Sequence, residues 1–390
     1  MTGDILKLPS DQDNSGRDLG EEEITLLKEV ISSGVLNSIR GTKVARFERE
    51  FASFYGVPYA VAVSSGTAAV HAAVAALNLE PGSEIITTPI TDMGAITPIL
   101  YESCVPVFAD VDPFSYNVTA ETIQKRITSR TKAVIVTHLF GDPCQMDGIL
   151  ALAAKHDLPV IEDCGQALMA EYRGQKAGTL GTIGVFSMQQ GKHMTTGEGG
   201  IVITKDSGLA RRIRLFVNKA WGYGDEHPDH YFLALNYRLT ELQAAVAIAQ
   251  LKKLPSVAAR RRAMARRMDD RLRPVKGIRI PQPPVQAAHS YWRYCLDIDP
   301  AVLGLDAQEL ASRLKPFGIL SVPRYIQKPA FRCEVLIKTD PRYQDESWCR
   351  REYPGAYQAL SRILVLPWNE HYTERHVDAI ADRILRCVSR

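Results

Sequence analysis

One lysine of the chain lies in surroundings that suit covalent chemistry. Lys192 stands in the sequence FSMQQGKHMTTGEGG (residues 186–200), among small, polar and glycine residues and not on an amphipathic face. A lysine amine that is deprotonated and held in place forms a Schiff base with an aldehyde. The alternative is a solvated loop lysine, which is the commoner state of this side chain. Lys192 is therefore a candidate catalytic residue.

Two further motifs could complete a site around this lysine. The strand-like segment Val160–Asp163 ends in two acids, and ligands bind at the carboxyl edge of parallel strands. The turn VSSGTA (residues 63–68) leads from a strand into a helix, where free amides bind anions and Gly66 allows a close approach. Each motif has an ordinary alternative, because both an aspartate and a serine or threonine commonly cap helices.

The three motifs together predict a cofactor. Pyridoxal phosphate needs an anion cradle, an acid for its ring nitrogen and a lysine for its aldehyde. The chain supplies these groups in the order Gly66–Thr67, Asp163 and Lys192. They lie on successive units of one α/β region, so that we expect them to meet at one edge of a sheet.

The elements that must position these groups follow a regular alternation. Short apolar segments alternate with helical patterns between residues 59 and 163, which predicts an α/β fold with a mostly parallel sheet. Prolines cluster after residue 276 and precede an alternating strand at Ser290–Ile298. We therefore expect a large domain over residues 1–255 and a smaller C-terminal α+β domain over residues 256–390.

The helical region near this boundary carries two local signals. Pro255 is expected to kink or break the helix, because proline lacks the amide that a helix interior needs. The run Arg260–Arg262 is expected to form a solvated helix face.

Composition excludes several classes of protein. The 390 residues carry a formal net charge of +3, which gives no case for a nucleic-acid partner. The seven cysteines form no CxxC pair, which argues against a disulfide framework and against a metal site. The polar N-terminus and the lack of a long apolar run predict a cytoplasmic protein without a membrane span.

The sequence resembles the DegT/StrS family of pyridoxal-phosphate-dependent sugar and aminocyclitol aminotransferases. The resemblance is strong from Glu21 to about Leu251 and looser beyond. It implies the type I fold of pyridoxal-phosphate transferases, with a large domain built on a mostly parallel, seven-stranded type of sheet. It also implies a homodimer with active sites at the interface. The matching stretches are SSGTAA (64–69), ADVDPFSYN (109–117), THLFGDP (137–143), EDCGQAL (162–168), FSMQQGKHMTTGEGG (186–200) and NYRLTELQAA (236–245).

The resemblance also implies roles for individual residues. Lys192 would form the Schiff base, and Asp163 would pair with the pyridine nitrogen. The other implied cofactor contacts are Gln166 beside the ring, Gly66, Thr67 and Ser187 at the phosphate, and Asn236 reaching the cofactor of the partner subunit.

The chain departs from the family pattern at two places. Met93 stands where the family usually has an aromatic residue on the pyridine ring; it could cover the ring through its sulfur, or belong to the core. Gln189 and Gln190 replace a His–Pro pair, and a similar pair occurs in cyclitol-type and aminohydroxybenzoate-type members. Two more residues are candidate substrate contacts, Arg238 for a carboxylate donor and Tyr325 in a substrate loop.

The resemblance therefore implies an aminotransferase that moves an amino group from glutamate or glutamine to a ketone. The acceptor would be a sugar nucleotide or a cyclitol, in polysaccharide or natural-product biosynthesis such as that of antibiotics. Two alternatives remain open, a dehydratase of the aminohydroxybenzoate-synthase type and a cofactor-binding regulator without turnover. The complete set of Lys192, Asp163 and Gln166 argues against the regulator.

Overall fold

The computed structural model describes residues 5–323 and 325–389. A seven-stranded sheet forms its centre, in the order β1-β9-β8-β5-β4-β2-β3. The strands from β8 to β3 pair in parallel, whereas β9 is antiparallel to both of its neighbours. This confirms the predicted α/β fold with a mostly parallel sheet. The strands are β1 Tyr59–Val63, β2 Glu84–Thr87, β3 Val105–Phe108, β4 Thr131–Thr137, β5 Val160–Asp163, β8 Ile183–Ser187 and β9 Gly200–Thr204.

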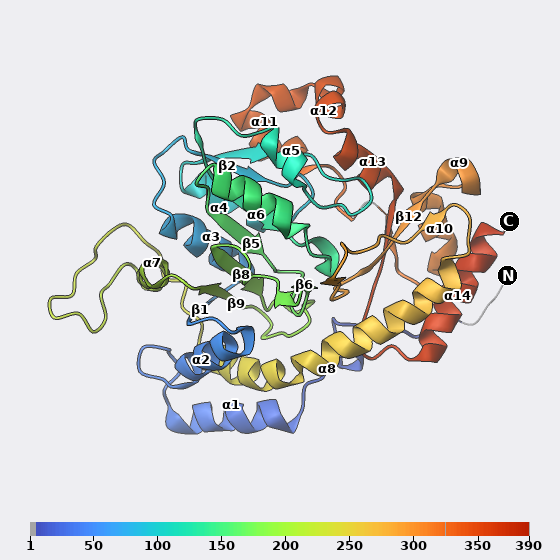
Figure 1. Cartoon of the computed structure of the whole chain (residues 1–390). Helices are drawn as coiled ribbons and strands as arrows, with labels where there is room; N and C mark the ends of the chain where they lie inside the picture. Colours follow the sequence, from blue (N-terminus) through green and yellow to red (C-terminus); the bar gives the residue numbers. More distant parts are fainter. Residues whose placement is uncertain (1–4, 324, 390) are drawn as a thin grey trace.

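Helices connect and cover these strands (Figure 1). Alanines make α3 compact enough to pack directly on β8 and β9, and eight of its small or β-branched residues belong to one buried cluster. On another side of the sheet, α2 packs against β1 and the long helix α8. The helices of this region are α1 Glu21–Ser33, α2 Lys43–Tyr55, α3 Gly66–Ala76, α4 Thr97–Tyr101, α5 Ala120–Gln124, α6 Met146–Lys155, α7 Ser207–Val217 and α8 Glu241–Leu272.

A second sheet, antiparallel and of four short strands in the order β10-β12-β14-β13, lies in the C-terminal part. It packs with α10, α14 and the end of α8 around a core of its own. Its strands are β10 Ile278–Arg279, β12 Tyr294–Ile298, β13 Val322–Pro323 and β14 Ile363–Leu366. The helices of this part are α9 Pro300–Leu303, α10 Ala307–Leu314, α11 Glu334–Thr339, α12 Glu346–Glu352, α13 Pro354–Arg362 and α14 Glu374–Val388.

Shorter elements complete the chain. A small three-stranded sheet, β11-β6-β7, joins the two parts of the chain. Its strands are β6 Glu171–Tyr172, β7 Gln175–Lys176 and β11 Ala287–Ala288. The short 3-10 helices are η1 Asn14–Gly16, η2 Met93–Ala95, η3 Leu139–Gly141, η4 Lys315–Phe317, η5 Ala330–Arg332 and η6 Pro341–Gln344.

The long helix α8 corrects two predictions. It passes through Pro255 without a break, so the expected break is wrong. The expected solvated arginine face is also wrong for Arg261, which is fully buried and pairs with Glu370 at 2.6 Å. Successive residues of a helix point about 100° apart, so neighbouring arginines need not share one environment. The domain boundary at residue 255 stays a prediction, since α8 runs across it.

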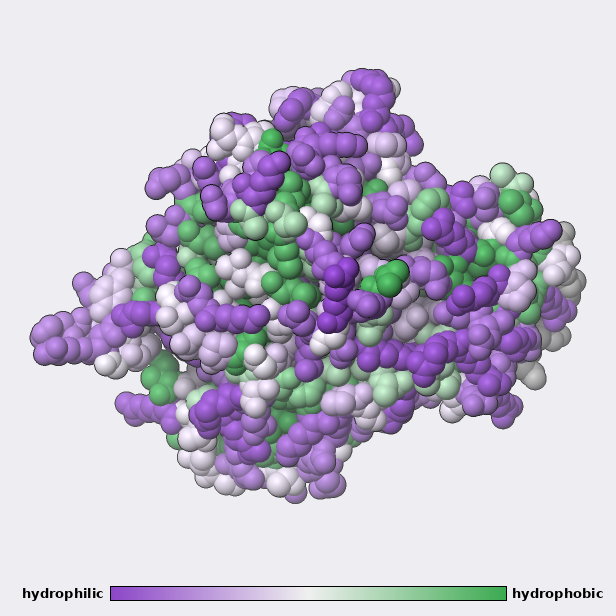
Figure 2. All heavy atoms as spheres, in the orientation of Figure 1, coloured by the Kyte–Doolittle hydropathy of each residue, from purple (hydrophilic) through white to green (hydrophobic). Residues whose placement is uncertain are grey.

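The surface shown in Figure 2 is mainly hydrophilic, with smaller hydrophobic patches between. The loop between α7 and α8 projects from the body of the molecule (Figure 1). This loop includes Leu233, which is 98% exposed. In the described part of the chain, no helix combines the length and apolarity needed to cross a membrane.

Candidate active site

A cavity of about 410 Å³ opens at the carboxyl ends of the parallel strands. The predicted residues that line it lie at the ends of β1, β5 and β8 or in the segments that follow these strands, with one from the C-terminal part. They are Gly66, Thr67, Asp163, Gln166, Ser187, Gln189, Lys192 and Tyr325. Since the carboxyl ends of parallel strands share one edge of a sheet, segments distant in sequence meet there.

The turn from β1 into α3 forms one wall of the cavity. Ser65 caps the helix, because its Oγ accepts a hydrogen bond from the amide of Ala68 at 3.0 Å. The amides of Gly66 and Thr67 belong to the first helical turn, where amides have no partner within the helix. A Cβ on Gly66 would lie only 2.7 Å from the Cβ of Ser187, so a glycine is required for this approach. The helix N-terminus and the Ser187 hydroxyl thus converge.

Asp163 ends β5 and faces Lys192 across the cavity. Its Oδ1 accepts the amide of Gly165 at 2.9 Å, and its Oδ2 lies 3.4 Å from the Thr137 hydroxyl that donates to it. Burial raises the pKa of the Asp163 carboxyl, while the hydrogen bond from Gly165 and the charge of Lys192 oppose this rise. A nearby cation such as protonated Lys192 therefore favours the ionised form of this carboxylate.

Gln166 is fixed between two segments. Its Oε1 accepts the amide of Phe140 at 2.8 Å, and its Nε2 donates to the Tyr325 hydroxyl at 3.4 Å. The Tyr325 ring packs edge-on against Phe140, with ring centroids 4.9 Å apart. Tyr325 therefore lines the cavity from the C-terminal part.

The amine of Lys192 lies in a poorly solvated environment. Burial lowers the pKa of Lys192 from its ordinary 10.5 to about 8, although the carboxylate of Asp163 acts in the opposite direction. At pH 8 about half of the molecules would therefore hold a neutral Nζ. A neutral amine is the form that attacks an aldehyde.

The two glutamines before Lys192 have different environments. Gln189 lines the cavity, and its Oε1 accepts the amide of Gly191 at 2.7 Å, which leaves its amide nitrogen for a ligand. Gln190 instead donates from its Nε2 to the carbonyl of Asp11 at 2.9 Å. Of these two glutamines, only Gln189 lines the cavity.

Besides Gln190, three predicted site residues do not join this cavity in the described part of a single chain. Met93 packs against the core that β2 and β4 share with η5, while its neighbours Asp92 and Gly94 line the cavity. Asn236 is exposed, and its Oδ1 accepts the amide of Arg238 at 3.3 Å. Arg238 lines a separate cavity beside α2 and α7.

Trp292 is a site residue that sequence patterns did not indicate. The Nζ of Lys192 lies 4.3 Å from the centroid of its indole ring, within the range of a cation–π contact. The indole Nε1 donates to the carbonyl of Gly191 at 2.7 Å. Trp292 follows Lys192 by 100 positions, and the strand-like pattern of residues 290–298 gave no sign of this contact.

Comparisons with known proteins agree with this arrangement. A sequence model of the DegT/DnrJ/EryC1/StrS aminotransferase family matches residues 17–385. The spore coat polysaccharide biosynthesis protein SpsC of Bacillus subtilis (strain 168) is 32% identical over 382 residues, covering 94% of each chain. The L-glutamine:2-deoxy-scyllo-inosose aminotransferase of Streptomyces fradiae is 40% identical over 255 residues, covering 62% of this chain and 60% of its own.

A solved structure extends the likeness to three dimensions. The crystal structure of 3-amino-5-hydroxybenzoic acid synthase superposes with a TM-score of 0.87, at 26% identity, over 96% of this chain and 98% of its own. This likeness confirms the type I pyridoxal-phosphate transferase fold that the resemblance implied. Because the family match spans nearly the whole chain, the protein belongs to the DegT/DnrJ/EryC1/StrS family and is an aminotransferase.

Proposed function

We propose that this aminotransferase binds pyridoxal 5′-phosphate beside Lys192 and transfers an amino group from glutamate or glutamine to a ring ketone. The observation that carries the proposal is that Lys192, Asp163 and the N-terminus of α3 border one cavity. An amine for an aldehyde, a carboxylate for a ring nitrogen and amides for a phosphate are the groups that this cofactor needs.

The phosphate of the cofactor fits the start of α3. The free amides of a first helical turn and the helix dipole favour an anion there. Gly66 and Ser187 are so close that a backbone amide and a hydroxyl border the same small space. Thr67 lines the cavity next to them. These groups are the ones we assign to phosphate binding.

The catalytic work is divided between two side chains. Bound pyridoxal phosphate would supply an aldehyde for the amine and a ring that accepts electrons from the substrate carbon. Asp163 would hold a proton on the ring nitrogen. The Nζ of Lys192 would bind the aldehyde and, once displaced by the donor, would remove a proton from the substrate carbon and return it as general base and acid. A pKa of about 8 suits both directions of proton transfer near neutral pH.

The acceptor we propose is a polyhydroxylated ring ketone, an inosose or a nucleotide-linked ketosugar. The cavity lining is polar, with Gln189, Asp92 and Glu198 among its residues. Such groups bind hydroxyls through hydrogen bonds. The name of the Streptomyces fradiae relative, which specifies L-glutamine and an inosose, supports the cyclitol and the glutamine donor.

The glutamine pair gives a matched test of this assignment. Gln189→Ala removes an amide from the cavity lining and leaves a substrate hydroxyl without its partner. Such a loss costs about 1–3 kcal/mol, so the acceptor KM should rise at least several-fold. Gln190→Ala is the matched comparison. Its amide contacts Asp11 instead, so any effect through the lysine loop should appear in kcat and not in the acceptor KM. Equal acceptor KM values for the two variants would show that Gln189 only braces the lysine loop.

A second candidate function is an aromatising dehydratase. The likeness to the 3-amino-5-hydroxybenzoic acid synthase structure favours it, and such an enzyme would use the same lysine. The purified protein should therefore be loaded with pyridoxal phosphate and given glutamine or glutamate with ketocyclitols, nucleotide ketosugars and 2-oxo acids. Turnover of 2-oxo acids alone would overturn the ring-ketone proposal. Formation of an aromatic product without use of an amino donor would favour the dehydratase.

A homodimer is part of the proposal. Asn236 is exposed and does not line its own cavity; it belongs to the loop between α7 and α8, which projects from the body (Figure 1) and includes the nearly fully exposed Leu233. We assign Asn236, and Arg238 with it, to the partner subunit's site. Mixing Lys192→Ala with Asn236→Ala chains should restore activity, because one site of each mixed dimer would then be intact. A fully active monomer in dilute solution would contradict this assignment.

A further inference from the structure

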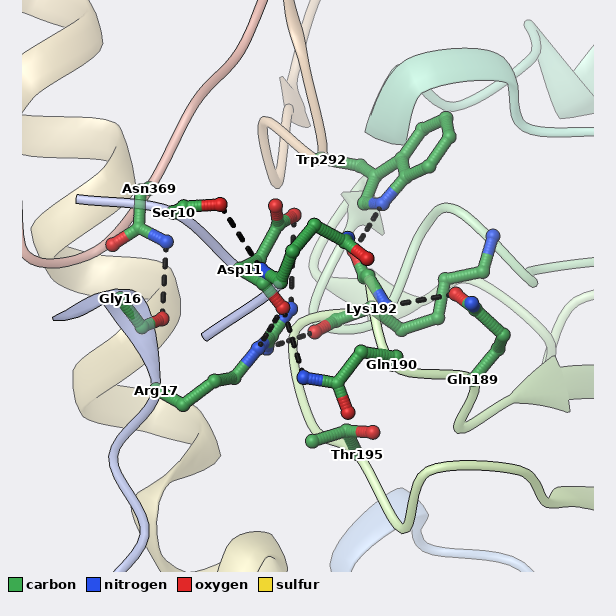
Figure 3. A network of polar contacts seen from close by, with 12 residues as sticks. Ser10, Asp11, Gly16, Arg17, Gln189, Gln190, Lys192, Thr195, Trp292 and Asn369 are labelled. Carbon is green, nitrogen blue, oxygen red and sulfur yellow. Dashed lines mark hydrogen bonds and ion pairs between the residues drawn. The ribbon is translucent and has the colours of Figure 1, made fainter. Parts of the chain in front are cut away.

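The main chain around Lys192 is held by residues outside its own motif (Figure 3). The carbonyl of Lys192 accepts a hydrogen bond from Nη1 of Arg17 at 2.8 Å. The carbonyl of Gly191 accepts one from Trp292 at 2.7 Å, and the side chain of Gln190 donates to the carbonyl of Asp11 at 2.9 Å. Three successive residues of the lysine loop are thus fixed by the N-terminal segment and by a residue just before β12.

Arg17 is buried, so water does not compete for its hydrogen bonds. Its side chain is only 3% exposed, and its Nε donates to the carbonyl of Asp11 at 2.9 Å. Its Nη2 lies 3.6 Å from the Asp11 carboxylate, which offsets part of the burial of the guanidinium charge. One planar guanidinium therefore ties two backbone carbonyls together, from Asp11 and from Lys192.

The Asp11 carboxylate also joins this segment to the other side of the lysine. Its Oδ2 pairs with Nη1 of Arg293 at 3.0 Å. The guanidinium of Arg293 lies 4.7 Å from the centroid of the Trp292 ring, the same ring that the Lys192 amine contacts. The N-terminal segment thus acts on the lysine through its main chain and through the residue beside its amine.

The segment that carries Arg17 is itself fixed. Asp13 caps η1 by accepting the amide of Ser15 at 2.8 Å. Asn369 donates to the carbonyl of Gly16 at 3.0 Å. A Cβ on Gly16 would lie 2.5 Å from both the carbonyl oxygen of Ser10 and the Nδ2 of Asn369, so this turn packs too closely for another residue. Contacts within residues 10–17 and with Asn369 therefore fix the position of Arg17 independently of the lysine loop.

We propose that residues 10–17 form a positioning strap for the lysine loop, in which Arg17 is a positioning residue that fixes the peptide unit of Lys192 and so keeps its Nζ between Asp163 and Trp292. The inference rests on the proposed role of Lys192. Loss of the bond would free the lysine backbone, and a misplacement of about 1 Å at a reacting group lowers rates by as much as about 100-fold.

The test compares Arg17→Gln and Arg17→Lys with a control, Arg350→Gln, at an arginine that is 61% exposed and pairs with Glu346. The first readout is the pH dependence of amidination of Lys192 by methyl acetimidate in the cofactor-free protein, followed by mass spectrometry. In Arg17→Gln the looser loop should hydrate the amine and raise its apparent pKa from about 8 toward 10.5. Arg17→Lys should restore part of the wild-type behaviour, and the control should match the wild type.

The second readout is turnover of the loaded enzyme. Arg17→Gln should lower kcat by about tenfold or more while changing the donor KM less than threefold. Asp11→Asn provides an independent variant should Arg17→Gln fail to fold. It removes the carboxylate that pairs with Arg17 and Arg293, and it should lower kcat in the same way. A wild-type apparent pKa and kcat in folded Arg17→Gln, or a wild-type kcat in folded Asp11→Asn, would contradict the proposed positioning role. Borohydride labelling of a lysine other than Lys192 in the wild type would instead overturn the proposed function.

Discussion

The buried amine of Lys192 should lower the free energy of unfolding of the cofactor-free protein at neutral pH. Lys192→Met should therefore raise this free energy. The pKa of Lys192 falls from 10.5 to about 8 on folding because burial disfavours the charged amine. Below pH 8 both the folded and the unfolded chain bind the proton, so the folded state carries the whole penalty. Between pH 8 and 10.5 the unfolded chain binds more protons, and stability rises with pH.

The size of the penalty follows from the same two values. A fall from 10.5 to about 8 corresponds to roughly 3 kcal/mol, at about 1.4 kcal/mol for each tenfold change. Although the amine is poorly solvated, the Lys192 residue as a whole is only partly buried, so solvent screening reduces this penalty. We therefore expect a gain of about 1–2 kcal/mol for Lys192→Met at pH 7. Methionine has a similar length and is flexible, so it should add little strain.

The assay is urea unfolding of the cofactor-free proteins at pH 7 and pH 10, at one protein concentration. The variant should be more stable at pH 7, and its advantage should shrink at pH 10, where the wild-type amine is neutral in the folded state. Lys338→Met, at an exposed lysine, is the control and should show no such change. An advantage that is the same at both pH values, or a variant less stable at pH 7, would refute the reasoning.

Three other substitutions test the site. Gly66→Ala should weaken binding of pyridoxal phosphate at least tenfold in a fluorescence titration, because the new Cβ would meet Ser187 at 2.7 Å; unchanged affinity would contradict the close approach. Asp163→Asn should retain cofactor but lose about 2–4 kcal/mol of transition-state stabilisation in kcat/KM, since it removes a charge beside the ring; a near-normal rate would argue against the role of Asp163. Trp292→Phe removes the hydrogen bond to the carbonyl of Gly191. Because this carbonyl would be left unpaired, the free energy of unfolding in urea should fall by about 1–3 kcal/mol. An unchanged free energy of unfolding would show that water replaces the indole.

The sequence predicted those features that depend on residues close together in the chain. The alternation of apolar strands and helices predicted the parallel sheet, and the ends of β1, β5 and β8 brought the expected Gly66, Asp163 and Lys192 to one edge. Each prediction depended on the residue types within about ten positions. Parallel strands then place their ends together without further information.

Long-range contacts were not predictable in this way. Arg17 and Trp292 meet the lysine loop across 175 and 101 positions, at Lys192 and Gly191 respectively. Arg261 was expected on a solvated face, but it is buried because the C-terminal part covers that side of α8. A charge run in the sequence cannot show which of its members a later segment will cover.

The buried position of Arg261 has a consequence for the site. Its Nη1 donates to the carbonyls of Tyr291 and Trp292 at 3.1 and 3.2 Å, and Glu370 neutralises its charge. Arg261 therefore fixes the backbone of Trp292 in the way that Arg17 fixes that of Lys192. The proposed reacting groups come from the edge of the large sheet, while two buried arginines from other segments hold the backbone carbonyls of Lys192 and Trp292. The position of the lysine thus depends on the packing of the C-terminal part against α8 as much as on its own motif.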